Sequence, residues 1–282
     1  MTEIVGIDAG GNQVKVFGER GTDIFLSELG EYRDLKLTNR ILPDDMVYEY
    51  RGDRGFAGTL AQRESEFSGS MMGSNKAHHD MVIRVLIALH RYAVKEYGHY
   101  NIIVGQPITN HTEAYKSLMK GMLIENHEFT LNGVTKYINI ERVEVSAEGA
   151  SSYWSSPRNG KIRIIDAGSG TVNIATIDNG MYIDKESDTL EFGLNTNISN
   201  DLEAFSRRVA ISCLKKWGRN DKVLLVGGHA IELLTYMRYH FPNSEVLQPN
   251  VLVKGTSTVL HPIYANAVAF YYVAKKVYAI GV

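Results

Sequence analysis

The chain has 282 residues, of which 44% are hydrophobic, and a formal net charge of −2. This near-neutral charge argues against a surface that holds nucleic acid by neutralising phosphates, so any link to DNA is expected to pass through another protein. Cys213 is the single cysteine, which excludes an internal disulfide and a thiolate metal cluster. Because no apolar run approaches the roughly 18 residues that span a bilayer, we expect a cytoplasmic protein with no membrane partner.

The chain opens with a pattern that predicts a hairpin with a glycine tip. An apolar run, Asp-Ala-Gly and a second apolar run predict strand, turn and strand from Glu3 to Phe17. Residues 18–75 are rich in glycine and charge and predict a small subdomain with short strands, one of them at Met46–Tyr50. Apolar residues then share one helical stripe, which predicts an amphipathic helix over Asp80–Tyr97.

The middle of the chain continues the alternation of strands and helices. A buried strand is predicted at Asn101–Gly105 and a helix at His111–Met122. Asn132-Gly133 between alternating residues predicts a second hairpin. Ser146–Ala150 is typical of a strand end that passes into a helix.

The opening pattern returns at residues 162–174. Six of the thirteen positions carry the same residue as residues 4–16, so the chain is expected to contain two homologous halves. The elements predicted after this repeat are helices at 199–217, 230–240 and 262–277 and a buried strand at 222–226.

The two glycine tips are suited to phosphate binding. Glycines without Cβ atoms let backbone N–H groups approach an anion, and two tips can grip a di- or triphosphate from opposite sides. Asp8 and Asp166, at the start of each tip, are suited to hold Mg²⁺, which prefers one or two carboxylates plus phosphate oxygens. Lys15 is placed to pair with a phosphate oxygen.

Two further segments are open to more than one interpretation. Gly227-Gly228 after a buried strand is either a plain turn or a backbone shelf for the sugar or α-phosphate of a nucleotide. Glu148 either activates a water molecule that attacks a phosphate or is an acid at a helix start. Neither a GxxxxGK[ST] nor a GxGxxG pattern occurs, which argues against P-loop and Rossmann proteins.

In combination these motifs resemble the superfamily of actin, sugar kinases and heat-shock chaperones. The chain is most similar to the bacterial plasmid-segregation actins of the ParM and AlfA type. The segments that carry this likeness are DAGGNQVK at 8–15, IIVGQPIT at 102–109, FTLNGVTKYINIERVEVSAEGA at 129–150, DAGSGTVNI at 166–174, SDTLEFGL at 187–194, VLLVGGHA at 223–230 and YANA at 264–267.

The resemblance implies an α/β, actin-like fold of two domains, each a ribonuclease-H-like half. Domain I would comprise residues 1–150, with a small subdomain IB at about 18–75, and would be completed by the C-terminal helix 262–282. Domain II would comprise residues 151–261. The segment between Ile174 and Val223 is too short for a full subdomain IIB, so we expect this subdomain to be absent or reduced, as in the AlfA type. Contacts to the nucleotide base are then expected to be weak or to come from a neighbouring subunit.

The resemblance also implies a site, cofactors and partners. Glu148 and Asp166 would be catalytic, Asp8 and Asp166 would hold Mg²⁺, and ATP or GTP would be bound. The residues expected to bind the nucleotide are Gly10, Gly11, Asn12, Gln13, Lys15, Gly168, Ser169, Gly170, Thr171, Gly227 and Gly228. The protein would hydrolyse the nucleotide, assemble into filaments and segregate a plasmid through a DNA-bound adaptor protein.

Two other functions remain open at this point. A small-molecule kinase, such as a type III pantothenate kinase, begins with a similar glycine turn and has a similar size. A nucleotide switch that does not polymerise would also use the same fold.

Overall fold

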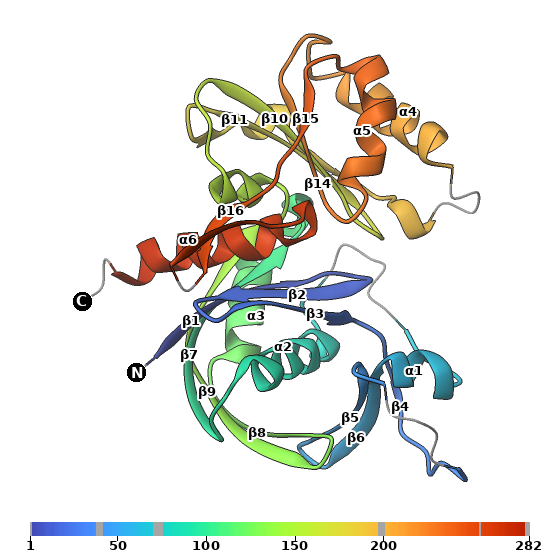
Figure 1. The fold of residues 1–282 in the computed structure, drawn as a ribbon, viewed down its shortest axis with the longest axis vertical. Coiled ribbons are helices and arrows are strands. Elements are labelled where there is room, and N and C mark those ends of the chain that lie inside the picture. The colour runs from blue at the N-terminus through green and yellow to red at the C-terminus, as the bar shows by residue number, and fades with distance from the viewer. Residues whose placement is uncertain (1, 38–41, 70–75, 197–200, 254, 280–282) are drawn as a thin grey trace.

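The structure is a computed structural model that describes residues 2–37, 42–69, 76–196, 201–253 and 255–279. Two mixed sheets lie on either side of helix α6 (Ala265–Ala279), which passes through the middle of the molecule (Figure 1). No helix in these ranges is long and apolar enough to cross a membrane.

The first sheet has nine strands in the order β3-β2-β1-β7-β9-β8-β5-β6-β4. Figure 1 shows that it curves around helix α2 (His79–Tyr92), whose side chains supply much of the first hydrophobic core. The strands are β1 Glu3–Ala9, β2 Gln13–Gly18, β3 Gly21–Leu26, β4 Leu29–Glu31, β5 Asp45–Tyr50, β6 Asp53–Gly58, β7 Tyr97–Gln106, β8 Asn126–Leu131 and β9 Val134–Ala147.

The second sheet has six strands. The main order is β12-β11-β10-β14-β15, and β13 pairs with β11. The strands are β10 Lys161–Ala167, β11 Val172–Asp178, β12 Met181–Tyr182, β13 Asp188–Leu190, β14 Val223–Val226 and β15 Ser244–Val246. Helices α4 (Leu202–Cys213) and α5 (Ala230–His240) pack on this sheet through the second hydrophobic core.

The two halves share one topology. In each, three consecutive strands pair antiparallel, and the first of them pairs parallel with a later strand on its other side. The hairpin registers also agree, because Asp8 lies opposite Lys15 and Asp166 lies opposite Asn173. The prediction of an α/β fold built from two homologous halves is therefore confirmed.

The helices differ in detail from the sequence predictions. They are α1 Thr59–Glu64, α2 His79–Tyr92, α3 Glu113–Leu123, α4 Leu202–Cys213, α5 Ala230–His240 and α6, and the short 3-10 helices are η1 Ile108–Asn110, η2 Ala150–Ser155, η3 Asp184–Glu186, η4 Leu194–Thr196 and η5 Pro262–Tyr264. The predicted helix 80–97 is wrong at its end, because the backbone becomes extended at Ala93 and residues from Tyr97 pair with β9. Residues 199 and 200 of the predicted helix 199–217 lie outside the described ranges. Helix α4 starts directly after Asp201, whose side chain caps its N-terminus.

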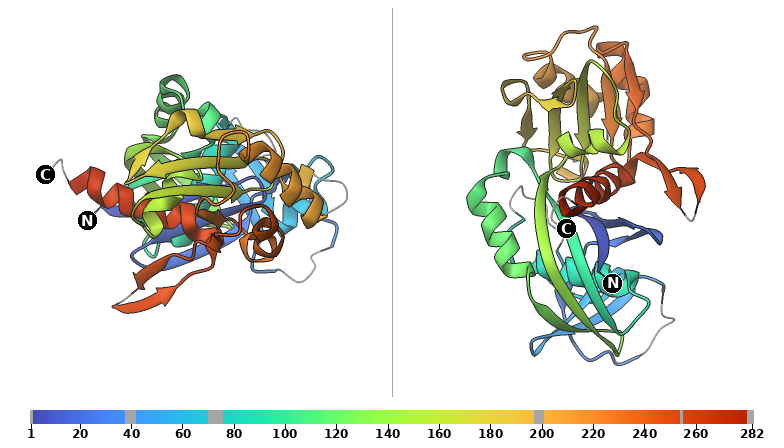
Figure 2. Two further views of the ribbon diagram at one scale, coloured as in Figure 1. Left: turned by 90° about the horizontal axis from the view of Figure 1, so that it is seen from above. Right: turned by 90° about the vertical axis from the view of Figure 1, so that its left-hand side faces the viewer.

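Two hairpins bear on the predictions. The β8–β9 hairpin is confirmed at Asn132-Gly133, where both residues have positive φ angles of 50° and 76°. A further hairpin, β16 (Asn250–Val253) and β17 (Thr256–Val259), was not predicted. It projects from the side of the molecule beside α6 (Figure 2, right), and its Val251 packs in a core cluster with Phe17 and Val268.

In the described ranges, the sheet of the second half has fewer strands than the sheet of the first half. Between β12 and α4 the described residues hold two 3-10 helices and the short strand β13. This agrees with the reduced subdomain IIB that the short spacing predicts. The division of the chain into domains at 150 and 261 remains a prediction, and residues 280–282 of the proposed C-terminal helix lie outside the described ranges.

Helix α6 packs directly on the backbone of β1. A Cβ atom at Gly6 would lie 2.2 Å from the carbonyl oxygen of Ala267 and 2.6 Å from the nitrogen of Tyr271. The absence of a side chain at Gly6 therefore permits this close approach. Further along the helix, the hydroxyl of Tyr278 donates to the carbonyl oxygen of Ile102 at 2.7 Å. These contacts fix α6 against the first sheet. The N-terminal residues of α6 then lie close enough to contact the second sheet.

Candidate functional site

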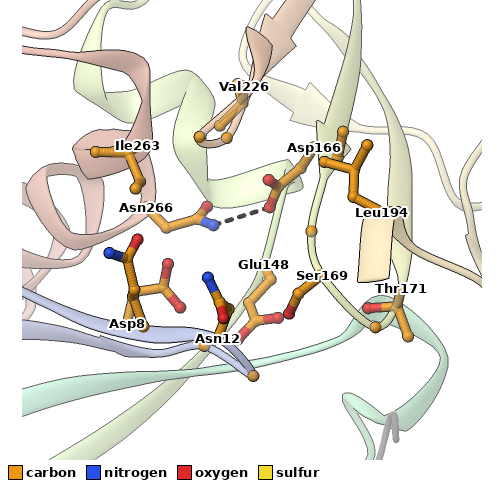
Figure 3. Close-up of a pocket in the computed structure, with 18 of the residues that line it drawn as sticks. Asp8, Asn12, Glu148, Asp166, Ser169, Thr171, Leu194, Val226, Ile263 and Asn266 are labelled. Carbon is orange, nitrogen blue, oxygen red and sulfur yellow. Dashed lines mark hydrogen bonds between the residues drawn. The ribbon is translucent and has the colours of Figure 1, made fainter. Parts of the chain in front are cut away.

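A cavity lies between the tips of the β1–β2 and β10–β11 hairpins (Figure 3). Every residue that the sequence proposed for the site lines it. Those residues are Asp8, Gly10, Gly11, Asn12, Gln13, Lys15, Glu148, Asp166, Gly168, Ser169, Gly170, Thr171, Gly227 and Gly228. The structure thus brings the predicted residues together from four separate segments, while the role of each remains a prediction.

The backbone of the first tip is fixed by contacts within the hairpin and with Ser27. The Lys15 amine lies 3.1 Å from Oδ2 of Asp8, the residue opposite it in the hairpin. A Cβ atom at Gly10 would lie 2.6 Å from the Lys15 amine and 2.8 Å from the carbonyl oxygen of Gln13, so glycine is required there. Ser27, which follows β3, braces the tip, because its hydroxyl donates to the carbonyl of Gly11 at 2.7 Å.

The second tip is clamped by a neighbouring segment. The N–H groups of Leu194 and Asn195 donate to the carbonyl oxygens of Gly168 and Ser169 at 3.0 and 2.9 Å. Gly193 presses on the same tip, since a Cβ atom there would lie 2.3 Å from the carbonyl oxygen of Ser169 and 2.6 Å from the nitrogen of Gly170. The segment 193–195 therefore fixes the backbone that would bind phosphate.

This clamp predicts the effect of a single methyl group. We expect Gly193→Ala to weaken nucleotide binding by about tenfold while the fold is kept, because the second tip must move to accommodate the new Cβ atom. Isothermal titration calorimetry of the purified variant measures the change. Gly121→Ala, on the exposed face of α3, is the control and should bind like the parent, because a Cβ atom there would meet open space. Equal affinity of the Gly193 variant and the control would contradict the clamp.

The third glycine turn packs beneath the second tip. Gly227 has a φ of +105°, and a Cβ atom there would lie 2.6 Å from the carbonyl oxygen of Ala167. Because a side chain is excluded both by conformation and by space, this position requires glycine. Gly228, His229 and Ile263 line the adjoining part of the cavity.

Asn266 of α6 links Asp166 to Gly149, the residue that follows Glu148. The amide of Asn266 donates to Asp166 Oδ2 at 2.8 Å (dashed in Figure 3), and its oxygen accepts from the N–H of Gly149 at 3.1 Å. Burial raises the pKa of Asp166, while the Asn266 hydrogen bond opposes this shift. Asn266 thus holds one aspartate and the turn that follows Glu148 in a fixed relation.

Glu148 lies in the turn between β9 and η2, and its side chain enters the cavity (Figure 3). Its N–H donates to the carbonyl oxygen of Gln106 at 2.9 Å. On one side it fills the space that Gly105 leaves free, since a Cβ atom there would lie 2.6 Å from Glu148 Oε1. On the other side its carboxylate pairs with Lys76. η2 begins two residues after Glu148, at Ala150, with Gly149 as its N-cap, and the Glu148 side chain lines the cavity.

The electrostatics of Glu148 differ from those of a surface acid. It is 6% exposed. Burial raises the pKa of its carboxyl group to about 7, and Lys76 opposes that shift. A carboxylate with such a pKa is suited to accept a proton near neutral pH.

Sequence reasoning missed several residues of this cavity. Lys76 belongs to no motif, and no local signal could have placed it here. Asn266 lies in the YANA segment, which carries the family likeness but no predicted role. The other residues that complete the lining are Ala167, Asn173, Leu194, Asn195, Val226, His229 and Ile263.

The donor set at the cavity fits Mg²⁺ bound together with phosphates. Asp8 and Asp166 supply hard carboxylate oxygens, and they repel each other electrostatically across the cavity. In the described part of the chain no three His, Cys, Asp or Glu residues are grouped so as to hold a metal by themselves. Two carboxylates need further oxygen ligands, and nucleotide phosphates and water supply these for Mg²⁺.

Comparison with known proteins supplies a family. Residues 6–150, slightly more than half of the chain, match the family described as the N-terminal domain of actin-like proteins. No curated protein sequence matches the chain significantly.

Solved structures with the same fold cover the whole chain. The AlfA filament bound to AMPPNP has a TM-score of 0.77 and 20% identity, with 100% of this chain and 99% of that chain covered. The apo psk41 ParM protein has a TM-score of 0.75 and 15% identity, with 99% and 98% covered. Ta0583, an archaeal actin homologue in complex with ADP, has a TM-score of 0.75 and 16% identity, with 98% and 100% covered. At these identities the likeness concerns the fold.

Proposed function

The chain belongs to the actin-like protein family, and from this membership we propose that it is a nucleotide-dependent filament protein that hydrolyses ATP or GTP. The observation that carries the proposal is the cavity itself. Two glycine tips at equivalent registers, each beginning with an aspartate, face each other, and a buried glutamate lies between them. The corresponding division of the chain would be domain I at 1–150 with the C-terminal helix, and domain II at 151–261.

The geometry supports a division of labour among these residues. Backbone N–H groups of the tips at 10–13 and 168–171 would bind the phosphates, with the Lys15 amine adding a charge. Asp8 and Asp166 would hold Mg²⁺, which supplies positive charge to the phosphate oxygens when it is bound. Glu148 would orient a water molecule and accept its proton as the water attacks the terminal phosphate. Asn266 holds Asp166 and the turn at Glu148 together through its two hydrogen bonds.

Assembly into filaments is the second part of the proposal. Similar solved structures include an AlfA filament and an Alp12 filament. A head-to-tail contact that does not close generates an open helix, so one pair of surfaces is enough for polymerisation. Nucleotide would control assembly through its different affinity for the free and assembled states. We further propose that the filament acts in the cytoplasm and segregates a plasmid through a DNA-bound adaptor protein.

Sedimentation tests this proposal directly. With ATP or GTP and Mg²⁺ the purified protein should scatter light and pellet at high speed, and electron micrographs of the pellet should show filaments. Without nucleotide it should stay in the supernatant. A protein that binds nucleotide yet remains a monomer at high concentration would reject filament formation, and transfer of phosphate to pantothenate by that monomer would favour a kinase.

A further inference from the structure

Lys76 is a buried cation in the cavity. It lies just before α2 and is 5% exposed, although lysine is among the residues that are least often buried. Its amine pairs with the Glu148 carboxylate, and the carboxylates of Asp8 and Asp166 act on it from further away. Lys15 pairs with Asp8 in the same cavity. Each of the two lysines therefore has a carboxylate partner of its own.

The surroundings of Glu148 indicate what this pair does. The Glu148 side chain packs over Gly105, where an added Cβ atom would lie 2.6 Å from Glu148 Oε1, and its carboxylate pairs with Lys76. Taking an ammonium group and a carboxylate out of water costs free energy, and their attraction offsets this cost only with good geometry. A pair of this kind is weak evidence for stability, but ionisable groups with perturbed environments in a cleft are typical of functional sites.

Glu148 needs a positive neighbour if it is to act as a base. Burial favours its neutral form, which cannot accept a proton from water, whereas the Lys76 charge favours the carboxylate. Burial also opposes the charged form of Lys76, but the carboxylates of Glu148, Asp8 and Asp166 outweigh it and raise the pKa of the amine. Lys76 therefore remains an ammonium group beside Glu148.

We propose that Lys76 is a positioning residue for hydrolysis, whose ammonium group keeps Glu148 ionised and directed into the cavity. This inference rests on the proposed hydrolase function. It assigns Lys76 an action through Glu148 and not through the nucleotide, which gives the lysine a distinct kinetic signature. Loss of Lys76 lowers kcat and leaves KM unchanged, because the nucleotide contacts remain.

A double-mutant cycle in nucleotide hydrolysis tests this action. Lys76→Met should lower kcat by roughly 10- to 100-fold at constant KM, and Lys76→Arg should restore part of the rate. In the background of Glu148→Gln, removal of Lys76 should cost nothing further, because the carboxylate on which it acts is gone. Lys116→Met, which breaks an exposed pair with Glu113 on α3, is the matched control and should hydrolyse like the parent.

The outcomes separate this inference from the function on which it rests. The inference is overturned if the fold-losses in kcat of Lys76→Met and Glu148→Gln multiply in the double variant. It is also overturned if adding Lys76→Met to Glu148→Gln raises KM, because Lys76 would then be a phosphate ligand. A parent protein without hydrolysis would reject the proposed function itself. If Lys76→Met does not fold, as judged by circular dichroism, Lys76→Gln and the double variant without either charge carry the same comparison.

Discussion

Replacing Glu148 by glutamine should lower the rate of nucleotide hydrolysis by about 100-fold or more, the range expected for loss of a general base. Glutamine has the same shape, so it should fit beside Gly105 without disturbing the turn, but its amide cannot take a proton from water. Filaments should still form with nucleotide and should persist longer, because hydrolysis no longer loosens them. Phosphate release and light scattering, followed together, measure both effects.

A second glutamate on the same strand supplies the control for this change. Glu144 lies on β9, pairs with Lys120 at 2.7 Å and has a side chain that is 42% exposed. Glu144→Gln should therefore leave hydrolysis unchanged. If Glu148→Gln also releases phosphate at the parental rate, Glu148 has a structural role only.

The pH dependence of hydrolysis should depend on the same residue. Burial raises the pKa of Glu148 to about 7, so at lower pH the group is increasingly protonated and cannot act as a base. The rate should therefore rise as pH increases through neutrality and level off above it. The residual rate of Glu148→Gln should lack this step, because glutamine does not titrate.

Much of the site could be predicted because its signals are local. The turn at Asp8-Ala-Gly and its repeat at Asp166-Ala-Gly are short patterns in which strand alternation and glycine determine the backbone. The two turns belong to two different sheets, and the repeat predicts two similar halves whose tips face each other across one cavity. Glycine positions were informative for the same reason: Gly10, Gly168 and Gly227 stand where a Cβ atom would collide with backbone or with Lys15.

The remainder depends on pairing between distant segments. Strand β5 joins the first sheet through β8, so the predicted small subdomain continues the main sheet instead of forming a sheet of its own. Lys76 follows no periodic pattern, and its place in the site depends on an ion pair with Glu148, which lies far along the chain. Asn266 likewise acts on Asp166 and Gly149 through tertiary contacts. Local propensity carries no information about such pairs.

The two glycine tips differ in how they are supported. The first is braced by Ser27 and carries its own counter-charge, Lys15. The second has Asn173 at the position equivalent to Lys15 and is braced by residues 193–195 and by Gly227. The duplicated halves thus provide one aspartate paired with lysine and one held by the neutral amide of Asn266. Asp166 is therefore the more weakly neutralised carboxylate in the cavity.

Substitution of either aspartate should change the nucleotide affinity in opposite directions with and without Mg²⁺. In Asp8→Asn and Asp166→Asn the affinity for nucleotide with Mg²⁺ should fall by about tenfold or more, because a neutral amide oxygen is a poorer ligand for a hard divalent cation. With EDTA the same variants should bind nucleotide more tightly than the parent, since a negative charge near the phosphates has been removed. The gain should be larger for Asp166→Asn, because no lysine pairs with that carboxylate among the described residues.

Fluorescent nucleotide titrations with Mg²⁺ and with EDTA measure both changes in one set of samples. Asp53→Asn, at the exposed start of β6, is the control and should keep the Mg²⁺ dependence of the parent. A variant that is merely misfolded would lose affinity under both conditions, whereas loss of a metal ligand produces opposite changes. If Mg²⁺ strengthens binding equally in the parent and in both variants, neither aspartate holds the metal, and the ion must be bound by the phosphates and water alone.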